Sequence, residues 1–338
     1  MRKPYVLLLS LLCLLGLPAG TAHAADNGSW SVYPVASKIA ARPYFALSAE
    51  PGQTLTDQVA VQNRTGRPLT FRLYAADAYN TARDGGFAVR TVRERMRGVG
   101  AWAKPAKPRI TVPGHRTVTV PFTLHVPDGA EPGDHPGAIV ALDERIDPGS
   151  GRLALGVQRA VGARVYLRVG GPTLPALSVE HVRISHHQPL IPGLGDSTAT
   201  VSYTLRNTGN VTLGPEVELK ARGLFGRTLL HRDLTRVPAE LLPGQRVRLT
   251  ETWRGAPQFD RADVTLTASA PGTRQSAGAS FLALPRLLVA LVFAAGALTG
   301  ALLVRARRVR ARRSAPARPS PPGRTTPSRP RSSPSVRP

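Results

Sequence analysis

The chain has 338 residues and carries 45 Lys and Arg against 21 Asp and Glu, which gives a formal net charge of +24. Its one cysteine, Cys13, lies in the N-terminal apolar stretch, so apolar cores without disulfides must hold the rest of the chain. This composition argues against a disulfide-stabilised exported receptor, and the length suits two ordinary domains.

Residues 1–24 are typical of a secretory signal peptide. Arg2 and Lys3 precede an apolar run at 6–17, and residues 22–24 (Ala-His-Ala) form a small-x-small cleavage site. We therefore expect cleavage before Ala25 and export of the body that follows. A retained signal anchor is the alternative interpretation.

Period-2 alternation of apolar and polar residues recurs throughout the exported body, whereas no long stretch shows helical spacing. The clearest case is 117–126, where the even positions are apolar and most odd positions are polar, as in a half-buried antiparallel strand. The predicted strands span 44–49, 59–63, 69–75, 117–126, 165–169, 201–205, 246–253 and 264–270. Short strands divided by turn signals indicate β-sandwiches.

Two turn motifs each occur twice along the body. One strand ends at Asn63 and another at Asn207, and a Pro-Gly turn follows at 113–114 and again at 243–244. We infer two sandwiches of related plan, the first carrying an insertion within 79–107. The predicted fold is thus all-β, with two tandem immunoglobulin-like sandwiches at 25–170 and 171–272 and a linker at 273–286.

Residues 287–304 carry no charge and would span about 27 Å as a helix, close to the hydrocarbon thickness of a bilayer. Arginines follow at once, so the positive-inside rule predicts a single-pass protein with extracellular sandwiches and a disordered, cytoplasmic basic tail at 305–338. We therefore expect no nucleic-acid partner. Gly296 and Gly300 lie four apart, which suggests a weak homodimer or a mere compositional bias.

The body offers little chemistry. It contains no nucleophile motif, metal-protease motif or phosphate-binding loop, so we expect neither an enzyme nor a cofactor. His186 and His187 are adjacent and would point to opposite faces of a strand, which does not suit one metal ion. Acidic residues cluster at 128–147, where a calcium site is an alternative to a charged surface.

Aromatic residues on the irregular segment are the candidate ligand contacts. Tyr79 and Trp102 lie in the predicted insertion, with Asn80 beside Tyr79, and sugar rings stack on exposed aromatic faces. The alternative is that both rings fill the end of the sandwich.

Several short motifs of the first domain resemble a known family. They are Tyr44-Phe45 with Leu47, Pro51-Gly52-Gln53-Thr54, the strand ending at Asn63, Tyr79-Asn80-Thr81 before Gly85-Gly86, and Val126-Pro127 with Gly129 before Gly137-Ala138-Ile139. Over residues 30–170 their order resembles the peptidoglycan-binding domain of WxL-interacting proteins. That resemblance implies immunoglobulin-like domains, a C-terminal span and wall binding.

Two functions follow as hypotheses. The first is a membrane-anchored, non-enzymatic protein that binds peptidoglycan or an anionic wall polymer through its first sandwich and a secreted or surface protein through its second. The positive charge of the body would suit such a polymer, although it also suits a merely solvated surface. The alternative is an assembly factor that contacts a secreted partner by strand addition at an open sheet edge.

Overall fold

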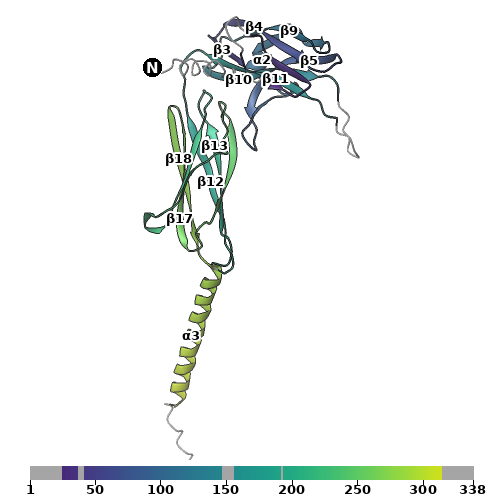
Figure 1. Ribbon diagram of the computed structural model, residues 1–338. Coiled ribbons are helices and arrows are strands. Elements are labelled where there is room, and N and C mark those ends of the chain that lie inside the picture. Colours follow the sequence, from purple (N-terminus) through teal and green to yellow (C-terminus); the bar gives the residue numbers. More distant parts are fainter. Residues whose placement is uncertain (1–24, 37–41, 147–155, 192, 314–338) are drawn as a thin grey trace, which may run out of the picture. The chain divides into compact units, whose positions relative to one another are not determined.

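A computed structural model describes residues 25–36, 42–146, 156–191 and 193–313 (Figure 1). The predicted signal peptide at 1–24 and most of the predicted tail, 314–338, lie outside the described residues. Over the described part the protein is built from strands, followed by one long apolar helix. The all-β fold class, with two pairs of sheets that each enclose a core and one C-terminal apolar helix, is confirmed over the described residues.

Residues 25–169 form two sheets that enclose one core (Figure 1). The first sheet has the order β1-β2-β4-β9-β7, and the second has the order β3-β11-β10-β5-β6, with β8 also paired to β5. The strands are β1 (Ala25–Asp26), β2 (Trp30–Pro34), β3 (Phe45–Ala49), β4 (Thr54–Asn63), β5 (Leu69–Asn80), β6 (Phe87–Val89), β7 (Ala103–Pro105), β8 (Arg109–Val112), β9 (Thr117–His125), β10 (Gly133–Asp143) and β11 (Ala160–Val169).

The alternation read from the sequence sets which residues enter this core. In β9 the side chains of Val120, Phe122 and Leu124 are buried and the residues between them are exposed. Trp30 and Phe71 meet at the centre, with ring centroids 5.2 Å apart. Apolar surface removed from water by such alternation is the main stabilising contribution in a chain without disulfides.

Residues 177–283 form a second pair of sheets around a second core. Their orders are β12-β13-β16 and β15-β14-β17-β18. The strands are β12 (Leu177–His187), β13 (Thr198–Asn207), β14 (Glu216–Arg222), β15 (Thr228–Asp233), β16 (Arg246–Arg254), β17 (Asp260–Ala270) and β18 (Thr273–Ala283), with a short 3-10 turn η1 (Leu224–Gly226).

The prediction of a linker at 273–286 is wrong over most of that range. β18 occupies 273–283 and pairs with β17 from Thr273 opposite Ala270 to Ala283 opposite Asp260. Its burial alternates only weakly, because the inward-facing Ala277, Ala279 and Phe281 of this edge strand are half-buried and two of them are small. The sequence pattern therefore lacked the strong apolar period that marks the other strands.

The two turn motifs found in the sequence occupy equivalent places. The Asn63 side chain donates to the carbonyl oxygen of Val112 at 3.0 Å, and the Asn207 side chain donates to that of Leu241 at 2.9 Å. Each asparagine is fully buried and joins the end of one strand to the segment before a Pro-Gly turn. Both sandwiches therefore use the same buried amide to satisfy backbone groups at a corner.

The region between β5 and β8 contains β6, the short helix α2 (Val99–Trp102) and β7. It covers the outer face of the second sheet near Ala76, Ala138 and Val140, which form a small apolar cluster of their own. The segment predicted as an irregular insertion therefore has local structure and a packing role.

The C-terminal unit contains the helix α3 (Arg286–Arg313). Its segment Leu287–Arg310 is long and apolar enough to cross a membrane, which agrees with the predicted span at 287–304. The helix continues beyond Val304 through the arginines, so the start of the expected disordered tail is helical. At Gly296 and Gly300 nothing lies within 4 Å of where a Cβ would be.

Candidate functional site

The two aromatic candidates lie on different elements and are both half-buried. Tyr79 is on β5, opposite Ala88 of β6, and the Arg90 guanidinium lies 5.8 Å from its ring centroid. Trp102 ends α2, packs against the first core, and has its ring 4.7 Å from that of His135. Each ring is thus held by protein neighbours on at least one side.

Asn80 is buried and its amide is fully used within the protein. Its nitrogen donates to the carbonyl oxygens of Gly85 and Glu240, each at 2.7 Å, and its oxygen accepts the amide of Leu242 at 2.9 Å. The side chain is only 5% exposed. A side chain with these bonds has no free group for a ligand, so Asn80 holds the two sandwiches together.

A different feature, the edge of β11, has unused binding capacity. The amide of Gly170 donates to Ala49 next to β3, whereas the carbonyl oxygen of Arg159 accepts the amide of Asp143 next to β10, both at 2.9 Å. Since backbone groups of successive strand residues point to opposite sides, the even-numbered residues of β11 point toward the β3 side. That side is occupied along only part of the strand.

β3 pairs in parallel with residues 165–169 alone. Over 160–164, β11 is bonded to β10 on one side, and no strand among the described residues pairs with it on the other. The amides and carbonyl groups of Ala160 and Gly162 therefore point to an open edge. Unpaired backbone groups at a sheet edge are a ready template for an incoming strand.

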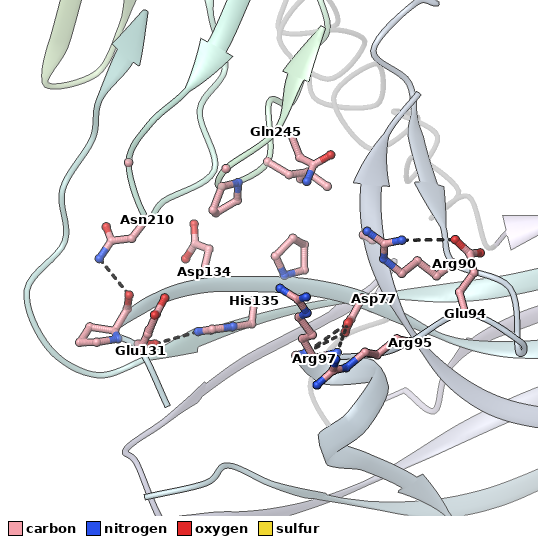
Figure 2. A pocket seen from close by; sticks show the side chains of 18 residues that line it. Asp77, Arg90, Glu94, Arg95, Arg97, Glu131, Asp134, His135, Asn210 and Gln245 are labelled. Atoms are coloured by element: carbon pink, nitrogen blue, oxygen red, sulfur yellow. Dashed lines mark hydrogen bonds and ion pairs between the residues drawn. The ribbon is translucent and has the colours of Figure 1, made fainter. Parts of the chain in front are cut away.

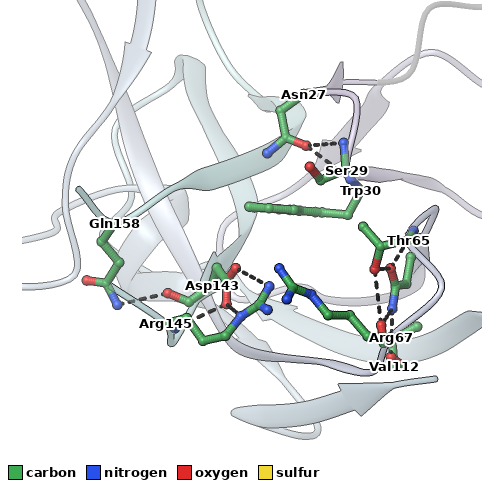
Figure 3. Close-up of polar contacts among 10 residues, drawn as sticks. Asn27, Ser29, Trp30, Thr65, Arg67, Val112, Asp143, Arg145 and Gln158 are labelled. Carbon is green, nitrogen blue, oxygen red and sulfur yellow. Dashed lines mark hydrogen bonds and ion pairs between the residues drawn. The ribbon is translucent and has the colours of Figure 1, made fainter. Parts of the chain in front are cut away.

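The hairpin that leads into this edge carries exposed apolar side chains. Ile146 follows β10 and is 62% exposed, and Val157 precedes β11 and is 56% exposed. Gln158 donates to the carbonyl oxygen of Asp143 at 2.9 Å, which closes the hairpin between them (Figure 3). Asp143 is itself buried and paired with Arg145. Val157 thus lies on the same segment as the open backbone, and Ile146 follows the neighbouring strand β10.

The sequence did not predict this edge, because the predicted strand at 165–169 begins five residues after the start of β11 at Ala160. The apolar alternation does extend backward from 165–169, at Val161 and Ala163, which are both buried. Gly162 between them interrupts the pattern of large side chains. The alternating pattern of β11 was therefore present in the sequence. Which part of its edge stays open depends instead on where β3 begins.

The outer face of β11 is fixed by polar contacts with the second sandwich. The hydroxyl of Tyr166 donates to Glu240 at 2.7 Å, and Arg164 pairs with the same carboxylate at 3.3 Å. Burial, and then the hydrogen bond to Glu240, raise the pKa of Tyr166 to about 12. The neighbouring Arg164 guanidinium lies 4.3 Å from the Phe87 ring centroid. These contacts hold the outer face of β11 against the second sandwich.

A cavity of about 700 Å³ lies between β5, α2 and loops of the second sandwich (Figure 2). Within its lining Arg90 binds Glu94, and Asp77 accepts the amides of Gly98 and Gly100. An Asp that caps a helix start is a structural group. The lining offers no nucleophile beside a base, so it does not suggest catalysis.

The acidic cluster and the histidine pair serve structural contacts. Asp134 binds Arg168 at 2.7 Å and accepts the amide of Thr212 at 2.7 Å, and Glu144 binds Arg109. His186 is half-buried against Phe281, while its neighbour is exposed on the opposite face. Within the described residues no three His, Cys, Asp or Glu side chains gather as metal ligands would.

No family model and no curated protein matches the chain. Among solved structures it is similar to a chaperone–tip adhesin complex of CFA/I fimbriae, with a TM-score of 0.37 and 9% identity over 75% of this chain and 98% of that chain. It is also similar to the class 5 fimbriae chaperone CfaA, with a TM-score of 0.34 and 10% identity over 76% and 99%.

A third similar structure is the CsuC–CsuE chaperone–tip subunit pre-assembly complex of Acinetobacter baumannii, with a TM-score of 0.34 and 8% identity over 74% and 98%. These three structures contain fimbrial chaperones. The expectation of a peptidoglycan-binding protein is corrected by the candidate residues themselves, because Asn80 is buried and both aromatic rings are held by protein contacts.

Proposed function

We propose that the protein is a membrane-anchored, non-enzymatic assembly factor that binds an exported protein by strand addition along residues 160–164 of β11. The observation that carries this proposal is the open edge of β11, where Ala160 and Gly162 direct their backbone groups away from β10 and beyond the reach of β3. The fitting partner is a protein segment with an unpaired, apolar strand.

The exposed apolar pair at the hairpin supports the same proposal. Strand addition gives affinity through main-chain hydrogen bonds and specificity through alternate side chains. Ile146 and Val157 would cover apolar side chains of an added strand, and the buried Val161 continues their row into the core. An edge without such apolar neighbours would bind any extended segment equally.

The anchor follows from α3. Its apolar segment Leu287–Arg310 includes arginines at its C-terminal end, and positive charge flanks the cytoplasmic side of a span. This orientation would hold the sandwiches on the exported side, where secreted partners emerge. Arginines next to the span also bind anionic lipid headgroups, at about 1 kcal/mol each.

The test uses a photo-crosslinking amino acid in place of Val157, in the full chain and in cells. Ala160→Pro removes one free amide on the open side and leaves the β10 ladder intact, because proline is tolerated at the start of an edge strand. Ala160→Val keeps the amide and is the matched control. We expect crosslinking to one exported protein in the Val variant and its loss in the Pro variant.

Equal crosslinking in both variants would show that the backbone of the edge takes no part. The same product from a probe at Thr119, an exposed position on β9 of the other sheet, would show nonspecific proximity. Either result overturns strand addition at β11.

A further inference from the structure

One end of the second sandwich gathers the loops nearest to the span along the chain. The strand register places the first residue of β17, Asp260, opposite Ala283, the last residue of β18. Three loops, with described residues 188–191 and 193–197, 223–227, and 255–259, join strands that end at this same level, as the pairs Thr198–Arg254 and Arg222–Asp263 show. We call these three loops, together with the end of β18, the Ala283 pole.

Exposed large apolar side chains concentrate on this pole. Among the described residues of 171–283, the second sandwich exposes one large apolar side chain at its other end, Leu174. The exposed apolar side chains of the three loops are Leu190, Ile191, Leu194, Leu224, Phe225 and Phe259. Such a concentration exceeds the scattered surface apolar residues of ordinary domains and marks a contact surface.

The turn at Leu224 and Phe225 forms a tip that specific contacts hold in place. Phe225 is fully exposed and has φ +58° and ψ +21°, a left-handed conformation that bulky side chains rarely adopt. Asp260 holds the turn by accepting the amide of Leu224 at 3.0 Å and pairing with Arg227 at 3.2 Å. Strain that the surroundings maintain at an exposed aromatic tip indicates a role for that tip.

A basic cavity adjoins the same tip. It measures about 590 Å³, and its lining includes Lys220, Arg222 and Arg261, with Asp263 as the one acid, beside Leu224 and Phe225. An excess of cations next to exposed apolar side chains matches a surface that is anionic at its headgroups and apolar beneath them.

The chain itself limits how far this pole can be from a bilayer. Two residues separate the end of β18 at Ala283 from the start of α3 at Arg286. At most about 3.6 Å per residue, this connection is on the order of 10 Å long. A headgroup layer lies within that distance of the end of a spanning helix.

We propose that the Ala283 pole docks on the outer leaflet of the bilayer that α3 spans, with Leu224 and Phe225 entering the interface and the basic cavity binding lipid phosphate. This inference rests on the proposed anchor. It assigns the pole a lipid partner, in contrast to the protein partner of β11. The second sandwich is thereby held against the membrane while the open edge of the first stays available.

The test places the full mature chain in vesicles of phosphatidylcholine with phosphatidylglycerol. Because the mature chain has no cysteine, Leu194→Cys gives one fluorescent label on the pole, and Leu174→Cys gives a matched exposed site at the opposite end. Lipids carrying a nitroxide quench labels near the acyl chains. We expect strong quenching at 194, little at 174, and a loss of the difference when Phe225→Ser is added.

The lipid phosphate part is tested by Arg222→Gln, which should reduce quenching at 194 in anionic vesicles and leave it unchanged in pure phosphatidylcholine. Equal quenching at 194 and 174 overturns the proposal, as does quenching that rises with protein density, which would assign the pole to a second copy. Flotation of the protein with the vesicles after a high-salt wash measures only whether α3 anchors it. The assay therefore distinguishes a failed anchor from a failed docking of the Ala283 pole.

Discussion

The side chain of Asn80, at the end of β5, donates to the carbonyl oxygen of Glu240, 160 residues further along the chain, at 2.7 Å. The same amide accepts from Leu242, so one buried side chain of the first sandwich satisfies two backbone groups of the second. Glu240 also binds Tyr166 through its carboxylate. This segment of the second sandwich is therefore held by both its backbone and its side chain.

Replacing Asn80 with Ala should destabilise the protein, because buried backbone groups at Gly85, Glu240 and Leu242 lose their partner. Each unsatisfied buried group costs about 1–3 kcal/mol. We expect the free energy of unfolding in urea to fall by at least about 2 kcal/mol. Asn27→Ala, at an exposed turn, is the matched control and should cost less than half as much. An equal loss of stability in both variants would contradict the conclusion that Asn80 links the two sandwiches through buried hydrogen bonds.

The stability of the protein should fall as pH rises from 10 to about 12, because the folded state keeps the Tyr166 proton more tightly than the unfolded state does. The stabilisation is complete below pH 10, the ordinary pKa of tyrosine, and is lost through the folded pKa. Tyr166→Phe should flatten this decline in urea unfolding measured at pH 9 and pH 11.5. An unchanged slope would mean that other groups dominate.

Trp102, a candidate sugar contact, should behave as a packing residue, and Trp30 serves as the fully buried reference. Trp30 is fully buried, so Trp30→Ala should cost about 3–5 kcal/mol in unfolding free energy. Trp102→Ala should cost roughly 2 kcal/mol, because the ring is half-buried against the same core. Thermal unfolding of both variants measures this. If the Trp102→Ala variant is as stable as the parent protein, the Trp102 ring does not contribute to the packing of the core.

Where the chain is cut should decide whether the second sandwich folds. A variant that ends at Pro271 lacks β18 and exposes the whole edge of β17, whereas one that ends at Ala283 keeps the ladder. We expect the longer variant to be released from the membrane as a folded protein and the shorter one to aggregate. Size-exclusion chromatography and circular dichroism separate these outcomes. Two equally folded variants would make β18 dispensable.

The sequence predicted several strands that alternate strongly, but β14 was missed although its buried Val217, Leu219 and Ala221 alternate with polar residues. Val120, Phe122 and Leu124 identify β9 because all three are large and buried, whereas the inward-facing residues of β18 include the small, half-buried Ala277 and Ala279. The sequence could predict the equivalent roles of Asn63 and Asn207. Each residue ends a strand, and its side chain donates to a backbone carbonyl oxygen at a buried corner.

The site was less predictable than the strands. Asn80 looked like a free polar side chain, because its partners at Glu240 and Leu242 lie in the other sandwich. The open half of β11 depends on how far β3 extends beside it, which is a property of pairing between distant segments. Local periodicity carries no information about such long-range register.

The parallel pairing of β3 with β11 also sets an order of folding. Residues 45–49 have no partner on that side until 165–169 are present, so the first sandwich stays incomplete during most of its passage across a membrane in a chain exported from its N-terminus. β18 crosses last, immediately before α3. In the proposed topology the second sandwich closes only as transfer stops, which keeps its β17 edge unpaired until α3 has entered the membrane.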